Sequence, residues 1–81
     1  MKTRIFLFLG LSAIATSVLA IGKQEVADIL LAEYPGANIT EIERETYRGQ
    51  KIFEVDFEYQ GEKLEAIIGL DGEIIKVQID D

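Results

Sequence analysis

Three short glycine-containing pairs divide the second half of the chain into segments of equal length. The pairs are Gly49-Gln50, Gln60-Gly61 and Asp71-Gly72, and the first residues of successive pairs lie 11 positions apart. Glycine readily adopts the positive φ that a two-residue hairpin turn requires, so each pair predicts a tight reversal between antiparallel strands. The spacing therefore predicts four sequentially paired strands, over Ile39–Arg48, Lys51–Tyr59, Glu62–Leu70 and Glu73–Asp80.

Two-residue turns also predict which residues lie opposite each other, because pairing is counted outward from each turn. One face is then apolar over the last three strands, with the rows Thr46-Phe53-Ile68-Ile75, Arg44-Val55-Ala66-Val77 and Ile42-Phe57-Leu64-Ile79. The other face is mostly charged, apart from the row Tyr47-Ile52-Gly69-Ile74. Ile39 and Ile42 do not alternate, which indicates a β-bulge or a late start in the first strand.

An amphipathic helix is predicted over Lys23–Tyr34, and Pro35 ends it by disfavouring a helical conformation at the preceding residue. Its apolar side comprises Val26, Ala27, Leu30, Leu31 and Tyr34. The sequence therefore predicts an α+β fold in which one N-terminal helix packs on one face of a four-stranded antiparallel meander sheet. The expected core consists of Val26, Leu30, Tyr34, Phe53, Val55, Phe57, Leu64, Ile68, Ile75 and Val77.

Arg44 is the one charged residue expected in the middle of the helix-covered face. A buried guanidinium without partners is costly. We therefore expect Arg44 either to extend to the edge of the sheet or to pair with Asp28 or Glu33 of the helix.

The first 20 residues have the features of a secretory signal peptide. Lys2 and Arg4 are followed by the apolar run Ile5–Leu19, and small residues before position 21 predict cleavage after Ala20. Cleavage after Ala15 is an alternative, and a transmembrane anchor is less consistent with a run shorter than about 20 apolar residues. The predicted organisation is a signal peptide over 1–20 and one domain over 21–81, exported to the periplasm or the extracellular space.

Charge narrows the classes of partner. All 15 acidic residues follow position 20, with six of the 8 basic ones, so the predicted mature domain carries a net charge of −9. Nucleic acids and anionic lipids both require positive surface, and neither is expected as a partner. The chain has no cysteine, so it contains no disulfide and no lipid-modified cysteine, and we expect no membrane anchoring once the signal is removed.

Catalysis is not expected. The chain has no His and no Cys, and its two serines, Ser12 and Ser17, belong to the signal peptide. The usual general base and nucleophiles are therefore missing from the domain. Asp56 and Glu65 form a carboxylate pair, but on an open sheet face such groups stay solvated. We predict no enzyme activity, no catalytic residues, no cofactor and no metal ligands.

Short motifs give the chain a family resemblance. Tyr34-Pro35-Gly36-Ala37, Phe53-Glu54-Val55 and Asp71-Gly72-Glu73-Ile74, within a stretch from about Lys23 to the C-terminus, resemble the PepSY domain. That family consists of small α-plus-β modules of exported bacterial proteins, found in peptidase propeptides and as free-standing units. The resemblance implies a non-enzymatic domain that acts by protein–protein contact, modulating or inhibiting a peptidase or another envelope enzyme. The matched residues have structural roles.

Two features of the predicted outer face are candidate surfaces. Its carboxylates are interpreted first as a solvated face, and alternatively as a docking surface for a cationic groove or a weak Ca²⁺ site. The row containing Tyr47 is interpreted first as local cover for Gly69, and alternatively as an apolar spot for a partner. The predicted partner surface comprises Tyr47, Ile52, Glu54, Asp56, Glu58 and Ile74. The alternative function is a small cation- or ligand-binding module using this acidic face.

Overall fold

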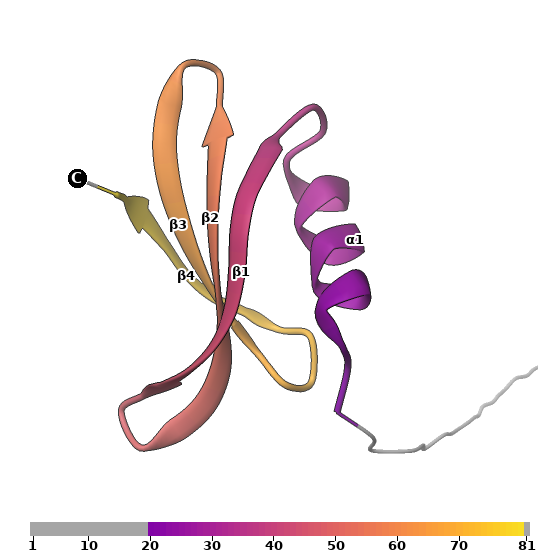
Figure 1. Cartoon of the computed structure of the whole chain (residues 1–81), viewed down its shortest axis with the longest axis vertical. Coiled ribbons are helices and arrows are strands. Elements are labelled where there is room, and N and C mark those ends of the chain that lie inside the picture. The colour runs from indigo at the N-terminus through magenta and orange to yellow at the C-terminus, as the bar shows by residue number, and fades with distance from the viewer. Residues whose placement is uncertain (1–19, 81) are drawn as a thin grey trace, which may run out of the picture.

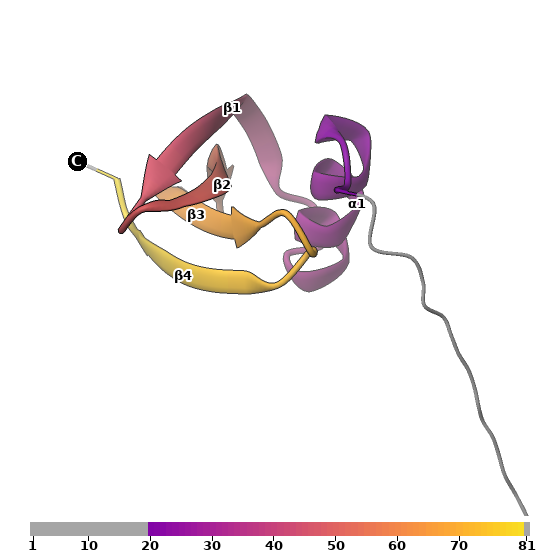
Figure 2. The ribbon, with the colours of Figure 1, turned by 90° about the horizontal axis from the view of Figure 1, so that it is seen from below.

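A computed structural model describes residues 20–80 and contains one helix followed by four strands (Figure 1). The helix α1 spans Lys23–Glu33, and the strands are β1 Asn38–Tyr47, β2 Gln50–Tyr59, β3 Glu62–Gly69 and β4 Ile74–Ile79. The strands form one antiparallel sheet in the order β1-β2-β3-β4. The helix lies on one side of this twisted sheet (Figure 2). The predicted α+β fold is confirmed, whereas the predicted signal peptide, except for Ala20, lies outside the described residues.

The turn between β1 and β2 differs from the prediction. Its central residues are Arg48 and Gly49, with φ of 53° and 78°, rather than Gly49 and Gln50. A hairpin turn with positive φ at both central positions is of type I′ and favours glycine second. Consequently Tyr47 pairs with Gln50, and Arg44 with Phe53 instead of Val55. The predicted β1–β2 register was wrong by two residues, which leaves every side chain on its predicted face.

The β2–β3 hairpin confirms the predicted register throughout. Its turn residues, Gln60 and Gly61, both have positive φ. Phe57 lies opposite Leu64 and Val55 opposite Ala66, as counted from this turn. These two strands form the centre of the sheet.

The β3–β4 connection is a three-residue loop, Leu70-Asp71-Gly72, rather than the predicted two-residue turn. The N–H of Gly72 donates to the backbone carbonyl of Gly69 at 2.9 Å, and the N–H of Gly69 donates to the backbone carbonyl of Glu73 at 2.8 Å. Gly72 has a φ of 92°, as a turn followed by a glycine bulge requires.

A register shift in β4 follows this loop. Ile74 pairs with Ile68, although Lys76 keeps its predicted partner Ile67, so Ile75 is an extra residue in β4. Ile74 therefore packs against the core, and Ile75 is 40% exposed. The predictions that Ile75 is buried and that Ile74 faces outward were wrong.

The irregularity predicted in the first strand is confirmed. Ile39 pairs with Phe57 and Glu41 with Asp56, which leaves Thr40 as the extra residue of a bulge. The Thr40 hydroxyl donates to the Asp56 carbonyl at 3.1 Å. The bulge lets both Ile39 and Ile42 pack against the core although they are three residues apart.

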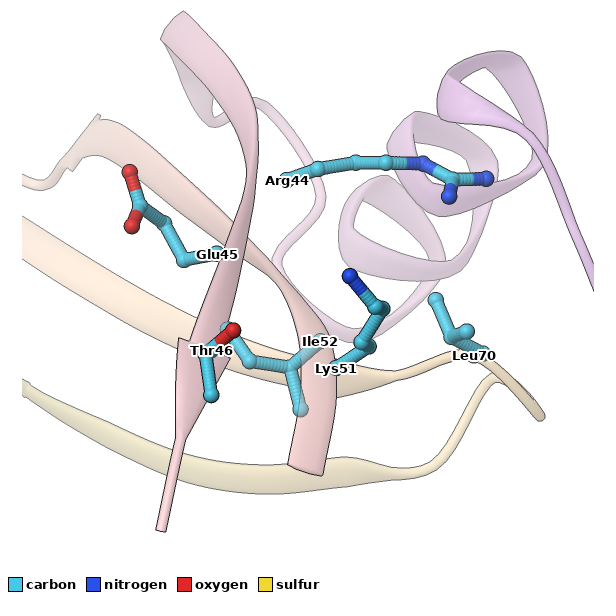
Figure 3. A pocket seen from close by; sticks show the side chains of 6 residues that line it. All are labelled: Arg44, Glu45, Thr46, Lys51, Ile52 and Leu70. Atoms are coloured by element: carbon cyan, nitrogen blue, oxygen red, sulfur yellow. The ribbon is translucent and has the colours of Figure 1, made fainter. Parts of the chain in front are cut away.

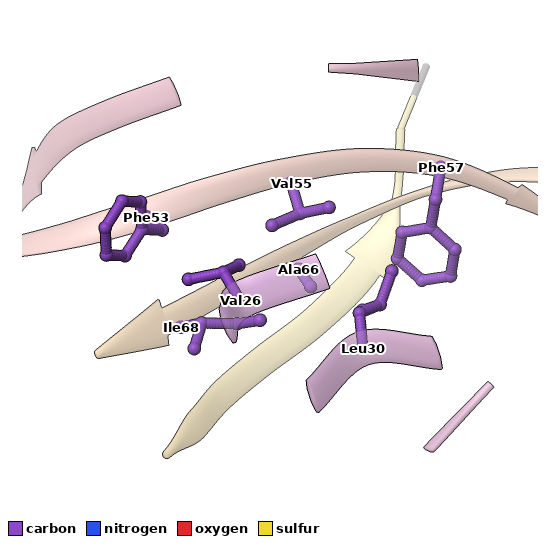
Figure 4. Packing of buried hydrophobic residues seen from close by; sticks show 7 residues of the cluster. All are labelled: Val26, Leu30, Phe53, Val55, Phe57, Ala66 and Ile68. Carbon is purple, nitrogen blue, oxygen red and sulfur yellow. The ribbon is translucent and has the colours of Figure 1, made fainter. Parts of the chain in front are cut away.

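The core lies between α1 and the three later strands (Figure 4). Its fully buried residues are Val26, Leu30, Phe53, Val55, Phe57, Ala66 and Ile68. Tyr34, Leu64 and Val77 pack against this cluster while half-buried, as does Ile74. Leu31 was expected on the apolar side of the helix but is 39% exposed. Among the predicted core residues, all except Ile75 are buried or half-buried.

Hydrogen bonds define the start of α1, and aromatic contacts connect its end to the sheet. The Ile21 N–H donates to the Leu70 carbonyl at 3.2 Å, and the Glu25 carboxylate accepts from the Gly22 N–H at 2.9 Å. At the other end, the Tyr34 ring contacts Phe57, with centroids 5.1 Å apart, and Tyr59, at 5.2 Å. The helix ends before Pro35 as predicted, with Tyr34 as its C-cap.

Phe57→Ala should destabilise the protein by about 3–5 kcal/mol, because it leaves a cavity beneath Tyr34 and Leu30 that a small domain cannot close. Ile79→Ala is the control, since Ile79 is 63% exposed and its truncation should cost far less. Denaturant unfolding followed by circular dichroism measures both variants. Equal midpoints for the two would contradict this assignment of the core.

Candidate functional site

The outer face of the sheet, which we define as the face away from α1, carries most of the acidic side chains of the strands. One row across it is Glu41-Asp56-Glu65-Gln78, and the next is Glu43-Glu54-Ile67-Lys76. Facing pairs such as Glu43–Glu54 and Asp56–Glu65 bring like charges together, which is unfavourable unless a proton or a counter-charge intervenes.

A second apolar cluster lies beside these carboxylates. Ile52 and Ile67 are only 2% and 5% exposed, although they lie on the opposite face of the sheet from the core. Ile52 is paired with Gly69, and a Cβ built on Gly69 would lie 2.8 Å from Oδ1 of Asp71 and 3.7 Å from Cδ1 of Ile75. Ile75 thus lies over the gap at Gly69. We call Ile52, Ile67, Gly69 and Ile75 the Gly69 cluster.

The structure brings together only part of the predicted partner surface. Ile52, Glu54, Asp56 and Glu58 alternate along β2 and share the outer face. Tyr47, half-buried, lies at the tip of the β1–β2 hairpin opposite Gln50, with the Arg48 guanidinium 5.3 Å from its ring centroid. The predicted row is therefore broken at both ends.

Ile74 does not belong to the partner surface, because it packs on the helix side of the sheet. Ile67 and Ile75 take part in the apolar cluster instead and were missed in the sequence. A three-residue loop at Leu70-Asp71-Gly72, in place of a two-residue turn, changes the register of β4, and this loop could have been recognised in the sequence. The Asp71 carboxylate accepts the Glu73 N–H at 3.0 Å, a local bond typical of aspartate in turns.

The carboxyl groups of Glu54 and Glu65 lie close together on the outer face, with oxygen atoms within 4.8 Å of each other. The hydrogen bond between their side chains is the largest cause that raises the pKa of Glu54, to about 7, followed by burial and the nearby charges of Glu65 and Asp56. The same hydrogen bond lowers the pKa of Glu65, as does the bond from Gln78, whose Nε2 donates to Glu65 Oε1 at 2.8 Å. Glu54 is therefore mostly protonated only below a pH of about 7, whereas the lowered pKa of Glu65 keeps that carboxyl ionised there.

The neighbouring carboxyl groups also bind protons more tightly than usual. Burial, then the charges of Asp80 and Glu65, raises the pKa of Asp56. A hydrogen bond with Glu43, followed by its charge, raises the pKa of Glu41. The outer face is thus crowded with negative charge that protonation or a cation relieves.

Two sets of three carboxylates are close enough to share a cation. Oxygen atoms of Glu43, Glu45 and Glu54 lie within 4.8 Å of one another, and so do those of Glu54, Asp56 and Glu65. Carboxylate oxygens suit hard cations such as Ca²⁺, which takes six to eight oxygen ligands, so water would have to supply the remaining ligands of either set. Both sets lie on the outer face, where the sequence predicted an acidic surface.

A cavity of about 300 Å³ lies at the far end of the outer face. Its lining includes Asp56, Glu58, Lys63 and Asp80. The cavity places one ammonium group among three carboxylates.

No helix over residues 20–80 is long and apolar enough to cross a membrane.

Comparisons of the chain with protein-family models, with curated proteins and with solved structures find no match. The role of the outer face is therefore inferred from its residues, their geometry and their charges.

The protein should become less stable as the pH rises from about 5 to 8. The folded-state pKa of Glu54, about 7, lies above its ordinary value of 4.5, so its stabilising contribution is fully present below 4.5 and is lost as the pH rises through about 7. Glu65, with its lowered pKa, acts oppositely, and only as the pH falls below 4.5. Melting temperatures across this range measure the effect.

Glu54→Gln should flatten this pH dependence and raise the melting temperature at pH 8, because it removes the charge that ionisation creates. Glu58→Gln, an exposed change on the same strand, is the control and should retain the slope of the unchanged protein. If Glu54→Gln also retains that slope, ionisation of Glu54 is not the cause of the pH dependence.

Proposed function

We propose that this protein is an exported PepSY-type domain that acts by protein–protein contact and modulates a peptidase or another envelope enzyme. The proposal assigns no catalytic activity to the protein itself. The observation that carries it is the composition of the outer face, where the Gly69 cluster, exposed at Ile75, borders a dense field of carboxylates.

An apolar centre with a charged surround is the usual composition of a protein-binding surface. Ile75 contributes a side chain 40% exposed at the edge of the cluster, and Ile52 provides a buried base beneath it. The carboxylates of Glu54, Asp56 and Glu65 favour a partner with a cationic surface. A partner that places a cation there also relieves the repulsion within the rows.

The residues of the PepSY resemblance occupy positions that hold this surface in place. Phe53 and Val55 point into the core while Glu54, between them, points outward. Tyr34-Pro35-Gly36 ends the helix, and Asp71-Gly72 forms the loop that positions Ile74 and Ile75. Their structural roles are consistent with the family resemblance, from which the peptidase partner is inferred.

The first test is inhibition followed by binding kinetics. The protein should slow casein hydrolysis by a peptidase of the extracellular fraction, and the captured peptidase is then used for surface plasmon resonance. Ile75→Ser should act mainly by faster dissociation, because apolar anchors hold a formed complex. Asp56→Asn with Glu58→Gln should slow association about threefold to tenfold and weaken its salt dependence.

A matched control removes two charges from the helix instead. Asp28→Asn with Glu33→Gln changes the net charge equally but leaves the outer face intact. If this pair of changes slows association as much as the outer-face pair, attraction depends on net charge alone. If the helix pair impairs inhibition and the outer-face variants do not, the contact surface is on the other side of the molecule.

The alternative is a cation-binding module, favoured by the convergence of carboxylate oxygens within 4.8 Å at Glu54, Asp56 and Glu65. In that case Ca²⁺ should raise the melting temperature, because a ligand at about 100 times its Kd stabilises the native state by about 2.7 kcal/mol. Glu65→Gln should remove the rise, while Glu58→Gln retains it. A melting temperature independent of Ca²⁺ excludes this function and leaves the docking proposal intact.

A further inference from the structure

The free edge of β1 has the length and exposure to accept another strand. β1 comprises 10 residues at one edge of the sheet, longer than the typical strand of about 5–6 residues. Among the described residues, β2 alone pairs with it, and in Figure 2 no strand lies along its other edge. Such an edge presents unpaired backbone N–H and carbonyl groups, which form ladder hydrogen bonds with an added strand.

The two faces of β1 carry different charges along this edge. Glu41, Glu43 and Glu45 are exposed on the outer face. On the helix side, Ile42 is half-buried, and the exposed residue beside it is Arg44, whose guanidinium carbon lies 5.2 Å from the Phe53 ring centroid. An added strand therefore meets carboxylates with one set of alternate side chains and a cation with the other.

A cavity extends the cationic side of the edge. It has a volume of about 270 Å³, and it is lined by Arg44, Glu45, Thr46, Lys51, Ile52 and Leu70. In Figure 3 the Arg44 and Lys51 side chains both extend toward the space beside α1, whereas the Glu45 carboxylate lies on the other side of β1. Two cationic groups and a hydroxyl thus line one cavity in an otherwise acidic domain, an environment that suits a carboxylate.

We propose that the free edge of β1 binds an extended segment of a partner protein with alternating charge. In this arrangement, Lys or Arg side chains of the segment face the glutamates of the outer face. A Glu or Asp side chain between them enters the cavity lined by Arg44 and Lys51. This inference concerns the free edge of β1, whereas the proposed peptidase contact is centred on the Gly69 cluster and the carboxylates of β2 and β3, and it does not depend on that proposal.

A second β1 strand is disfavoured as the occupant. If two copies joined β1 to β1 in antiparallel fashion, the glutamates of the two outer faces would lie opposite one another, and like charges directly opposite are destabilising. Arg44 also points toward the helix side of an edge strand, a placement that opposes indiscriminate pairing. The same charge distribution therefore rejects a copy of itself and selects a complementary segment.

Two peptides of identical composition separate register from net charge. The first is acetyl-Thr-Lys-Val-Lys-Glu-Lys-Val-Lys-Thr-amide, which places its Glu on the side of its Val residues. In the second peptide, this Glu is exchanged with the preceding Lys, so that Glu faces the outer glutamates and Lys faces Arg44. Because the contact with the outer glutamates and the contact with Arg44 both change from attractive to repulsive, the first should bind the protein at least about fivefold more tightly.

Backbone amide exchange locates the binding. The first peptide should protect amide protons of β1 from hydrogen exchange, because its backbone completes their hydrogen bonds. Equal affinities for the two peptides, or protection of β4 at the other edge, would overturn the proposal.

Charge reversal supplies an independent test. Arg44→Glu should weaken binding of the first peptide, and replacing the peptide's Glu by Lys should restore it. Because Arg44 also contacts Phe53, Lys51→Gln is tested alongside and should lower the affinity without that loss of packing. Arg48→Gln is the matched control, since Arg48 lies in the turn of the same hairpin outside the cavity lining. A loss of affinity with Arg48→Gln as large as with Lys51→Gln would indicate attraction by charge alone.

Discussion

The burial of one face of β2 beneath α1 is the contact on which the other features depend. Phe53, Val55 and Phe57 occupy alternate positions of this strand and are packed against Val26 and Leu30 of the helix. Because successive side chains of a strand point to opposite faces, fixing these three residues also fixes Glu54 and Asp56 on the outer face. The position of the candidate site is therefore a direct consequence of the packing of the core. A change in the β2 backbone would affect both.

The sequence predicted the faces of the sheet more accurately than its pairs. The β2–β3 register was correct because Gln60-Gly61 is a two-residue turn with glycine at the second position. At the first hairpin, glycine was assigned to the first turn position instead, and the pairing slipped by two residues. A slip of two keeps every side chain on its face, because the side-chain period of a strand is also two. For this reason, the predicted core was largely correct despite the wrong partners.

The candidate site was predicted only in part, and the reason is chemical. Ile74 and Ile75 are identical side chains at adjacent positions, so no pattern of polarity distinguishes the one that faces the core. The three-residue loop and the bulge of β4 decide this, and both depend on hydrogen bonds around Gly69 and Gly72. The hydrogen bond between Glu54 and Glu65 likewise forms because the two residues are diagonal neighbours on adjacent strands. The face on which the carboxylates lie was predicted from the sequence, but this contact between two of them was not.

The raised pKa of Glu54 makes the charge of the outer face responsive to its surroundings. A cationic group that approaches Glu54 favours the ionised form of this carboxyl and lowers its pKa, so the proton is released as the contact forms. The face thus gains negative charge at the moment when that charge strengthens the attraction. By linkage, association with a cationic surface becomes weaker as the solution becomes more acidic. One hydrogen bond between two glutamates therefore couples complex formation to proton release.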